Sequence, residues 1–164
     1  MSDLEQLRET VRSHCIETQD FPAAGVLFRD YTPLFCDGAA FAEVIDAIAA
    51  DVIAKGGVDK VVGIEARGFL LCAALGYRLR VGVVPIRKAG KLPPPTERES
   101  YALEYAEATI EVGPHAITDG DRVLLVDDVL ATGGTMVAAA ALMRKLGAQA
   151  MKNAQLTFNS AMVG

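Results

Sequence analysis

A chain of 164 residues with a hydrophobic content of 51% is long and apolar enough to form one domain with an ordinary core. Its net charge of −5 argues against a general nucleic-acid binder, because contacts to a phosphate backbone require clustered Lys and Arg. Its apolar runs are far shorter than the roughly 20 residues that cross a bilayer. We therefore expect neither nucleic-acid nor membrane partners, although a small anionic ligand is compatible with this charge.

Residues 1–10 carry three acidic side chains where a secretory signal would be basic and then apolar, which predicts a cytoplasmic protein. The three cysteines, Cys15, Cys36 and Cys72, are odd in number and widely spaced. This spacing fits neither a disulfide framework nor a Cys-x-x-Cys site, so we interpret them as buried thiols in a reducing compartment.

The first third of the chain predicts two helices separated by a loop. Apolar residues recur at helical spacing over residues 4–15, which indicates an amphipathic helix on the outside of the domain. Residues 21–35 mix prolines and a glycine with aromatic and aliphatic side chains, so we expect an ordered apolar loop that covers something. A second helix is expected over residues 41–54, where it ends at two glycines.

Short runs rich in β-branched residues predict the strands of a central sheet. Residues 60–64 and 122–126 are each followed by a loop and an apolar helix, and residues 79–86 offer a strand between them. This order favours an α/β fold, in which a mostly parallel central sheet is flanked by helices. Ligands of such sheets bind at the carboxyl ends of the strands.

The segment 87–100 is rich in basic residues and contains three consecutive prolines. We interpret it as an exposed basic loop that acts as a lid. Residues 101–105 and 109–112, which follow it, are expected to form a short hairpin.

The most informative segment is residues 123–135, VLLVDDVLATGGT, in which a buried strand turns through glycines into a helix. Gly133 and Gly134 allow the backbone to take positive φ and to approach a ligand closely. Free amides and the hydroxyls of Thr132 and Thr135 can then hold a phosphate at the helix N-terminus.

Asp127 and Asp128 lie just before this phosphate site and are placed to accept hydrogen bonds from sugar hydroxyls. In isolation, two acids and two glycines could simply cap a helix and form a turn. A P-loop is excluded in its usual form, because the Gly-Lys pair at 90–91 is followed by leucine. The combination of features therefore favours a site for a ribose 5-phosphate.

This segment resembles the phosphoribosyl-pyrophosphate motif of the type I phosphoribosyltransferases. Other stretches resemble the adenine phosphoribosyltransferase family in particular, and the similarity extends from about residue 4 to residue 147 with a shortened, divergent C-terminus after it. The stretches that carry the second resemblance are residues 21–33, 63–69, 87–93 and 101–105.

The resemblance implies a single type I phosphoribosyltransferase-like domain over residues 1–164. A small hood over residues 21–35 would cover the base, and the lid loop over residues 87–100 would close on the substrates. The implied reaction transfers the 5-phosphoribosyl group of phosphoribosyl pyrophosphate to adenine, giving AMP and pyrophosphate in purine salvage. The resemblance also implies a homodimer, and Mg²⁺ that is bound through the substrate and not directly by the protein.

The family resemblance implies roles for residues at both ends of the sugar substrate. Arg67 follows a strand and precedes a helix, so its guanidinium suits catalysis at the departing pyrophosphate, with Lys88 and Lys91 adding charge from the lid. A structural salt bridge is the alternative for each lysine. The residues implied to hold the ribose hydroxyls and the 5-phosphate are Asp127, Asp128, Ala131, Thr132, Gly133, Gly134 and Thr135.

At the base end, the resemblance implies that Phe28 packs against the purine ring while the backbone of Leu27 and Arg29 reads the edge of the ring. Glu104 would exchange a proton with the base if partial burial raised its pKa. Taken alone, Phe28 could equally be a core residue and Glu104 a surface charge.

The chain departs from the family after residue 147, where we expect neither the further strand nor the Gly-Arg segment of family members. This departure predicts an open sheet edge, which would invite association. Two other functions therefore stay open, since a fold does not settle function. They are a guanine or hypoxanthine phosphoribosyltransferase, and a catalytically weak truncated isoform or nucleotide-sensing protein on the same fold.

Overall fold

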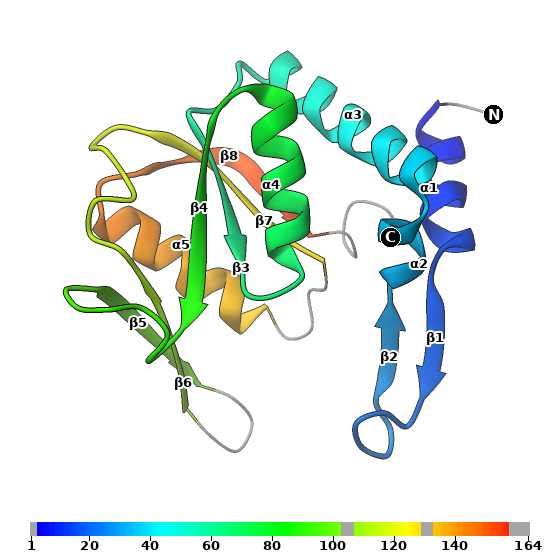
Figure 1. Ribbon diagram of the computed structural model, residues 1–164, viewed down its shortest axis with the longest axis horizontal. Helices are drawn as coiled ribbons and strands as arrows, with labels where there is room; N and C mark the ends of the chain where they lie inside the picture. The colour runs from blue at the N-terminus through cyan, green and yellow to red at the C-terminus, as the bar shows by residue number, and fades with distance from the viewer. Residues whose placement is uncertain (1–2, 103–106, 129–132, 158–164) are drawn as a thin grey trace.

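The computed structural model describes residues 3–102, 107–128 and 133–157, and within them a six-stranded sheet forms the centre of the fold (Figure 1). The strand order is β5-β6-β4-β3-β7-β8. Strands β4, β3, β7 and β8 are parallel, whereas β6 and β5 add an antiparallel edge. The expectation of a mostly parallel sheet is confirmed, and the two antiparallel strands make the sheet a mixed one. The strands are β3 (Lys60–Ile64), β4 (Gly82–Lys88), β5 (Glu97–Ala102), β6 (Glu107–Val112), β7 (Arg122–Asp127) and β8 (Gln149–Thr157).

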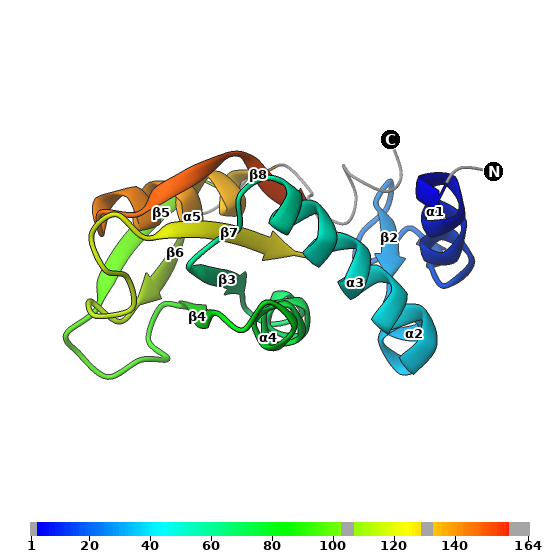
Figure 2. The ribbon, with the colours of Figure 1, turned by 90° about the horizontal axis from the view of Figure 1, so that it is seen from above.

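Helices cover both faces of this sheet, with α4 on one side and α5 on the other (Figure 2). Because both faces are covered, the central strands β3 and β7 are apolar almost without interruption, which explains why their sequences predicted them well. Val61 and Leu124 pack with α3 and α4, while Val62 and Leu125 pack with α5. The helices are α1 (Asp3–Ser13), α2 (Thr32–Cys36), α3 (Gly38–Ala54), α4 (Gly68–Leu79) and α5 (Gly134–Lys145).

Helix boundaries follow local chemistry. The Asp37 carboxylate accepts hydrogen bonds from the amides of Ala39 and Ala40, so α3 begins three residues earlier than the expected residue 41. Helix α4 continues to Leu79 and ends at Arg80, which adopts φ +57°. The strand expected over 79–86 therefore begins only at Gly82, since the helical pattern extends beyond the point where β-branched residues become frequent.

The segment 21–35 is not a loop throughout, as the sequence had suggested. It contains β2 (Leu27–Asp30), which pairs antiparallel with β1 (Ile16–Gln19), and most of α2. This β1–β2 hairpin stands beside the main sheet and not in it (Figure 1). Both strands have only four residues and neither has a fully buried residue, so they lack the apolar alternation that identifies a strand.

The loop expected over residues 87–100 is shorter in the structure. Residues 87–88 belong to β4, where they pair with β6, and residues 97–100 belong to β5. The connecting loop is therefore limited to residues 89–96. The hairpin expected after it does form, but between β5 and β6, and residues 103–106 at its turn lie outside the described residues.

The prediction that the C-terminal part lacks a further strand was wrong. Strand β8 pairs parallel with β7, with a shift in register between Val123 and Leu125. Pairing of strands depends on backbone amides and carbonyls, so it tolerates a sequence that departs from the family.

The three cysteines are not all buried, in contrast to the interpretation of the sequence. Cys72 is buried against the backbone of β3, Cys15 is half-buried, and Cys36 at the end of α2 is exposed. Each is a free thiol. Among the described helices, none combines the length and apolar character that a membrane crossing requires.

Candidate active site

The candidate site lies at the carboxyl ends of β3 and β7, which are neighbouring parallel strands. The loop after β3 carries Glu65 and Arg67, and β7 ends at Asp127, which Asp128 follows. Because parallel strands end at the same edge of a sheet, side chains that are distant in sequence converge there. The peptide bond between Glu65 and Ala66 in this loop is cis.

Arg67 contacts two of the other predicted site residues. Its Nε lies 2.6 Å from Oδ2 of Asp128, and its guanidinium lies 5.6 Å from the centre of the Phe28 ring. Asp128 is only 3% exposed, so this ion pair is shielded from solvent on the carboxylate side. The Phe28 ring also packs edge-on against Phe21, at 5.1 Å between ring centres. Phe28 thus joins the hairpin to the end of β7 through Arg67.

Asp127 has an unusual environment for an acid. Burial and the negative charge of Asp128 raise the pKa of Asp127 to about 7. Its Oδ1 accepts a hydrogen bond from the Asp128 amide at 2.9 Å. A side chain on Gly68 would place Cβ 3.1 Å from that same Oδ1, so the glycine allows α4 to begin against the end of β7. An elevated pKa beside a cationic partner is typical of functional sites.

The predicted phosphate site is described only in part. Gly133 adopts φ +82°, a conformation that glycine takes without steric cost, and α5 begins directly after it at Gly134, followed by Thr135. Ala131 and Thr132 lie outside the described residues, as does Glu104. The described part therefore shows a helix that begins shortly after the acid pair in the sequence, and the N-terminus of a helix favours anions.

A carboxylate that the sequence analysis missed binds the basic segment. Oε1 of Glu65 accepts a hydrogen bond from Nζ of Lys91 at 2.6 Å, and Oε2 accepts one from the Lys88 amide at 2.9 Å. Nε of Arg87 lies 3.4 Å from Oε2. These contacts, that of Lys91 foremost, lower the pKa of Glu65 to about 2. The only signal in the sequence was an acid between a buried strand and Arg67.

A second missed carboxylate, Glu111 in β6, is fully buried. Its Oε1 accepts hydrogen bonds from the amides of Lys91 and Leu92, both at 2.9 Å, and its Oε2 lies 3.2 Å from Nε of Arg98. The backbone amides, with that of Leu92 foremost, lower the pKa of Glu111. The start of the loop over residues 89–96 is thus fixed to the sheet.

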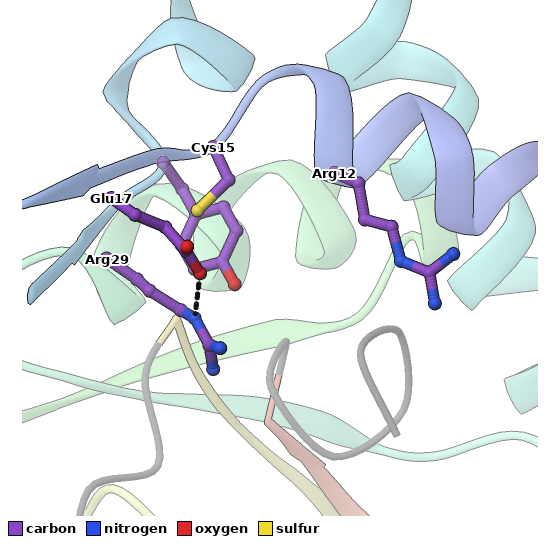
Figure 3. Close-up of a pocket in the computed structure, with 5 residues that line it drawn as sticks. Arg12, Cys15, Glu17 and Arg29 are labelled. Carbon is purple, nitrogen blue, oxygen red and sulfur yellow. Dashed lines mark hydrogen bonds and ion pairs between the residues drawn. The ribbon is translucent and has the colours of Figure 1, made fainter. Parts of the chain in front are cut away.

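Leu27 and Arg29 lie in β2 on either side of Phe28. Because side chains alternate along a strand, that of Arg29 points away from the side of Phe28. It binds Glu17 at 2.9 Å and lines a cavity of about 440 Å³ (Figure 3). The cavity is lined by Arg12, Cys15, Glu17, Arg29 and Tyr31.

Three comparisons place this geometry among known proteins. Residues 35–161 match the model of the phosphoribosyl transferase domain. The adenine phosphoribosyltransferase of Acidothermus cellulolyticus is 53% identical over 143 residues, which cover 87% of this chain and 80% of that protein. That of Salinispora arenicola is 55% identical over 139 residues, covering 85% and 73% of the two chains.

Solved structures agree with these relatives. The adenine phosphoribosyltransferase of Saccharomyces cerevisiae, complexed with adenine and an imino-altritol bisphosphate, superposes with a TM-score of 0.85 at 36% identity, covering 88% of this chain and 84% of that one. The enzyme from Thermoanaerobacter pseudethanolicus gives a TM-score of 0.82 at 43% identity, covering 87% and 83%.

Proposed function

Since this chain belongs to the adenine phosphoribosyltransferases, we propose that it transfers the 5-phosphoribosyl group of phosphoribosyl pyrophosphate to adenine, giving AMP and pyrophosphate. The chain is thus a pentosyltransferase of purine salvage. The observation that carries this proposal is the meeting of Arg67, Asp128 and Phe28, which brings a cation, a sugar-binding acid and an aromatic ring together at one sheet edge.

Asp127 and Asp128 bind the ribose hydroxyls in this proposal. Asp128 is buried and paired with Arg67, and its carboxylate oxygens can accept hydrogen bonds from hydroxyl groups. The N-terminal end of α5, with Gly133, Gly134 and Thr135, binds the 5-phosphate together with Ala131 and Thr132. Both ends of the sugar are then fixed relative to the anomeric carbon.

Arg67, Lys88 and Lys91 bind the pyrophosphate, which leaves as adenine attacks the anomeric carbon. When bound with the sugar substrate, Mg²⁺ neutralises charge on the leaving group. Burial and then the negative charge of Asp128 raise the pKa of Asp127, and a cation near the acid pair would offset that charge. Within the described ranges, no three His, Cys, Asp or Glu side chains form a metal-binding group.

The base is held by the hairpin. The Phe28 ring packs on the purine, and the backbone of Leu27 and Arg29 reads its edge, since the Arg29 side chain is engaged with Glu17. Glu104 exchanges a proton with the base. Closure of residues 93–96, beyond the part of the loop that Glu111 holds, excludes water from the activated sugar. A cytoplasmic homodimer is the expected state of the protein.

The proposal is tested by measuring AMP formation from phosphoribosyl pyrophosphate and adenine, with and without Mg²⁺, beside parallel reactions with hypoxanthine and guanine. Turnover with adenine alone supports it. Turnover with guanine or hypoxanthine would change the assigned base, and no turnover in a folded protein would favour a binding-only protein. Replacing Glu104 by Gln is expected to lower turnover with little change in the affinity for phosphoribosyl pyrophosphate.

A further inference from the structure

We propose that Glu65 is a positioning residue that holds the Lys91 ammonium when no substrate is bound, gives it up to the incoming pyrophosphate group, and takes it back as pyrophosphate leaves. This inference rests on the proposed function, in which Arg67, Lys88 and Lys91 bind pyrophosphate. Glu65 itself has no part in that binding, and a negative charge two residues from Arg67 opposes it.

Among the described residues, the hydrogen-bond and ion-pair partners of the Glu65 carboxylate lie in the basic segment over residues 87–100. Its carboxylate binds Nζ of Lys91 at 2.6 Å, the Lys88 amide at 2.9 Å and Nε of Arg87 at 3.4 Å. The carboxylate oxygens accept hydrogen bonds from these N–H groups, as the oxygens of a phosphate group would. Glu65 and the pyrophosphate group would therefore compete for the Lys91 ammonium.

The Lys91 side chain can exchange partners while its backbone stays in place. The Lys91 amide is fixed separately, through its hydrogen bond to the buried carboxylate of Glu111. The Lys91 side chain is 49% exposed and that of Glu65 is 10% exposed, so the ammonium end of this ion pair is open to solvent and can reach an incoming anion. The ammonium lies at the end of a flexible four-carbon stem, so it can leave Glu65 without moving the loop backbone.

Glu65 also influences product release. Pyrophosphate must leave after transfer, and a fixed carboxylate that recaptures Lys91 weakens the hold of the site on this product. Arg67 has the equivalent relationship with Asp128, but Asp128 additionally binds ribose in the proposed function. Glu65 is therefore the residue at which the effect on pyrophosphate can be separated from sugar binding.

Titration calorimetry of pyrophosphate with Mg²⁺ present, and pyrophosphate product inhibition of AMP formation, test this inference on wild type and Glu65→Gln. Glutamine keeps the size of the side chain and one acceptor oxygen, which can still bind the Lys88 amide, but it removes the charge. We expect Glu65→Gln to bind pyrophosphate roughly 5-fold more tightly, because the Lys91 ammonium no longer has to leave a charged partner. Glu9→Gln on α1 makes the same change in net charge at a distance and should leave the affinity unchanged.

A double-mutant cycle with Lys91→Ala identifies the exchanged cation. If Glu65 competes for Lys91, Glu65→Gln has no tightening effect in the Lys91→Ala background. Equal tightening in both backgrounds would overturn the inference in favour of a general charge effect, and unchanged or weaker binding in a folded Glu65→Gln protein would overturn it outright. If the wild type forms AMP and Glu65→Gln behaves identically, the inference about Glu65 fails while the proposed function stands. If the wild type neither forms AMP nor binds pyrophosphate, the proposed function and the inference both fail.

Discussion

Arg67 and Asp128 form an ion pair, with 2.6 Å between Nε and Oδ2, that links the loop after β3 to the end of β7. In the proposed function these two residues bind different parts of one substrate, the pyrophosphate and the ribose. Without substrate, Arg67 and Asp128 neutralise each other. Substrate binding therefore exchanges one ion pair for other charged contacts, and no unpaired charge has to be desolvated. This arrangement avoids the cost of leaving a buried carboxylate unpaired.

Replacing Asp128 by Asn is expected to weaken binding of phosphoribosyl pyrophosphate much more than binding of adenine. The variant loses the charged acceptor for the ribose hydroxyls and releases Arg67 from its partner. A hydrogen bond to a charged group contributes about 1.5–3 kcal/mol, so the loss in sugar affinity should be roughly 10- to 100-fold. Calorimetry with each ligand measures it, and equal losses for both ligands would contradict the assigned role.

Replacing Asp127 by Asn is expected to stabilise the fold while abolishing activity. The carboxyl titrates near 7 in the folded protein against a usual 3.8, so the folded state holds an extra proton between these values. Its contribution therefore makes the protein less stable as pH rises from about 4 to about 7, and the penalty is constant above that range. Asparagine removes the penalty.

Thermal unfolding at pH 5 and pH 8 checks this prediction. The gain in Tm should be a few degrees at pH 8 and smaller at pH 5, since about 1 kcal/mol shifts the Tm of a domain of this size by roughly 2–4 °C. Asp119→Asn, in an exposed loop, is the control. The same gain at both pH values would argue against a raised pKa for Asp127.

Replacing Gly63 by Ala is expected to destabilise the protein severely, by roughly 3 kcal/mol or more. A Cβ at Gly63 would lie 2.5 Å from Cβ of Cys72 and 2.6 Å from the carbonyl oxygen of Gly68. Strand β3 and helix α4 would have to separate, which moves Arg67. Denaturant unfolding should show the loss, while Gly113→Ala, whose Cβ meets nothing within 4 Å, should unfold as the wild type does.

Thiol labelling should follow the burial of the cysteines. Cys36 is exposed and should react first with iodoacetamide. Cys72 should react last, because burial raises the pKa of its thiol to about 11 and leaves little thiolate at neutral pH. Mass spectrometry of a labelling time course measures the order, and early modification of Cys72 would mean that α4 separates readily from β3.

Strands that carry an apolar pattern in their own residues were predictable from the sequence, whereas strands that depend on pairing with a neighbour were not. Strand β3 was predicted with its observed bounds, because a strand buried on both faces is an unbroken apolar run. Strand β2 was missed, because its four residues are only partly buried and its strand character comes from pairing with β1. Strand β8 was missed for a similar reason, since it adds to β7 through its backbone.

The sequence by itself determined the chemistry around residues 123–135, where a buried strand, two acids and a glycine turn follow one another. The tertiary structure alone decided which charges meet: Arg67 with Asp128, Lys91 with Glu65, and Arg98 with Glu111. The physical reason is that an ion pair requires two side chains within about 4 Å, and the order of strands in the sheet sets that separation. Spacing along the chain determines contacts within a turn or a helix, but it does not determine which strand ends lie side by side.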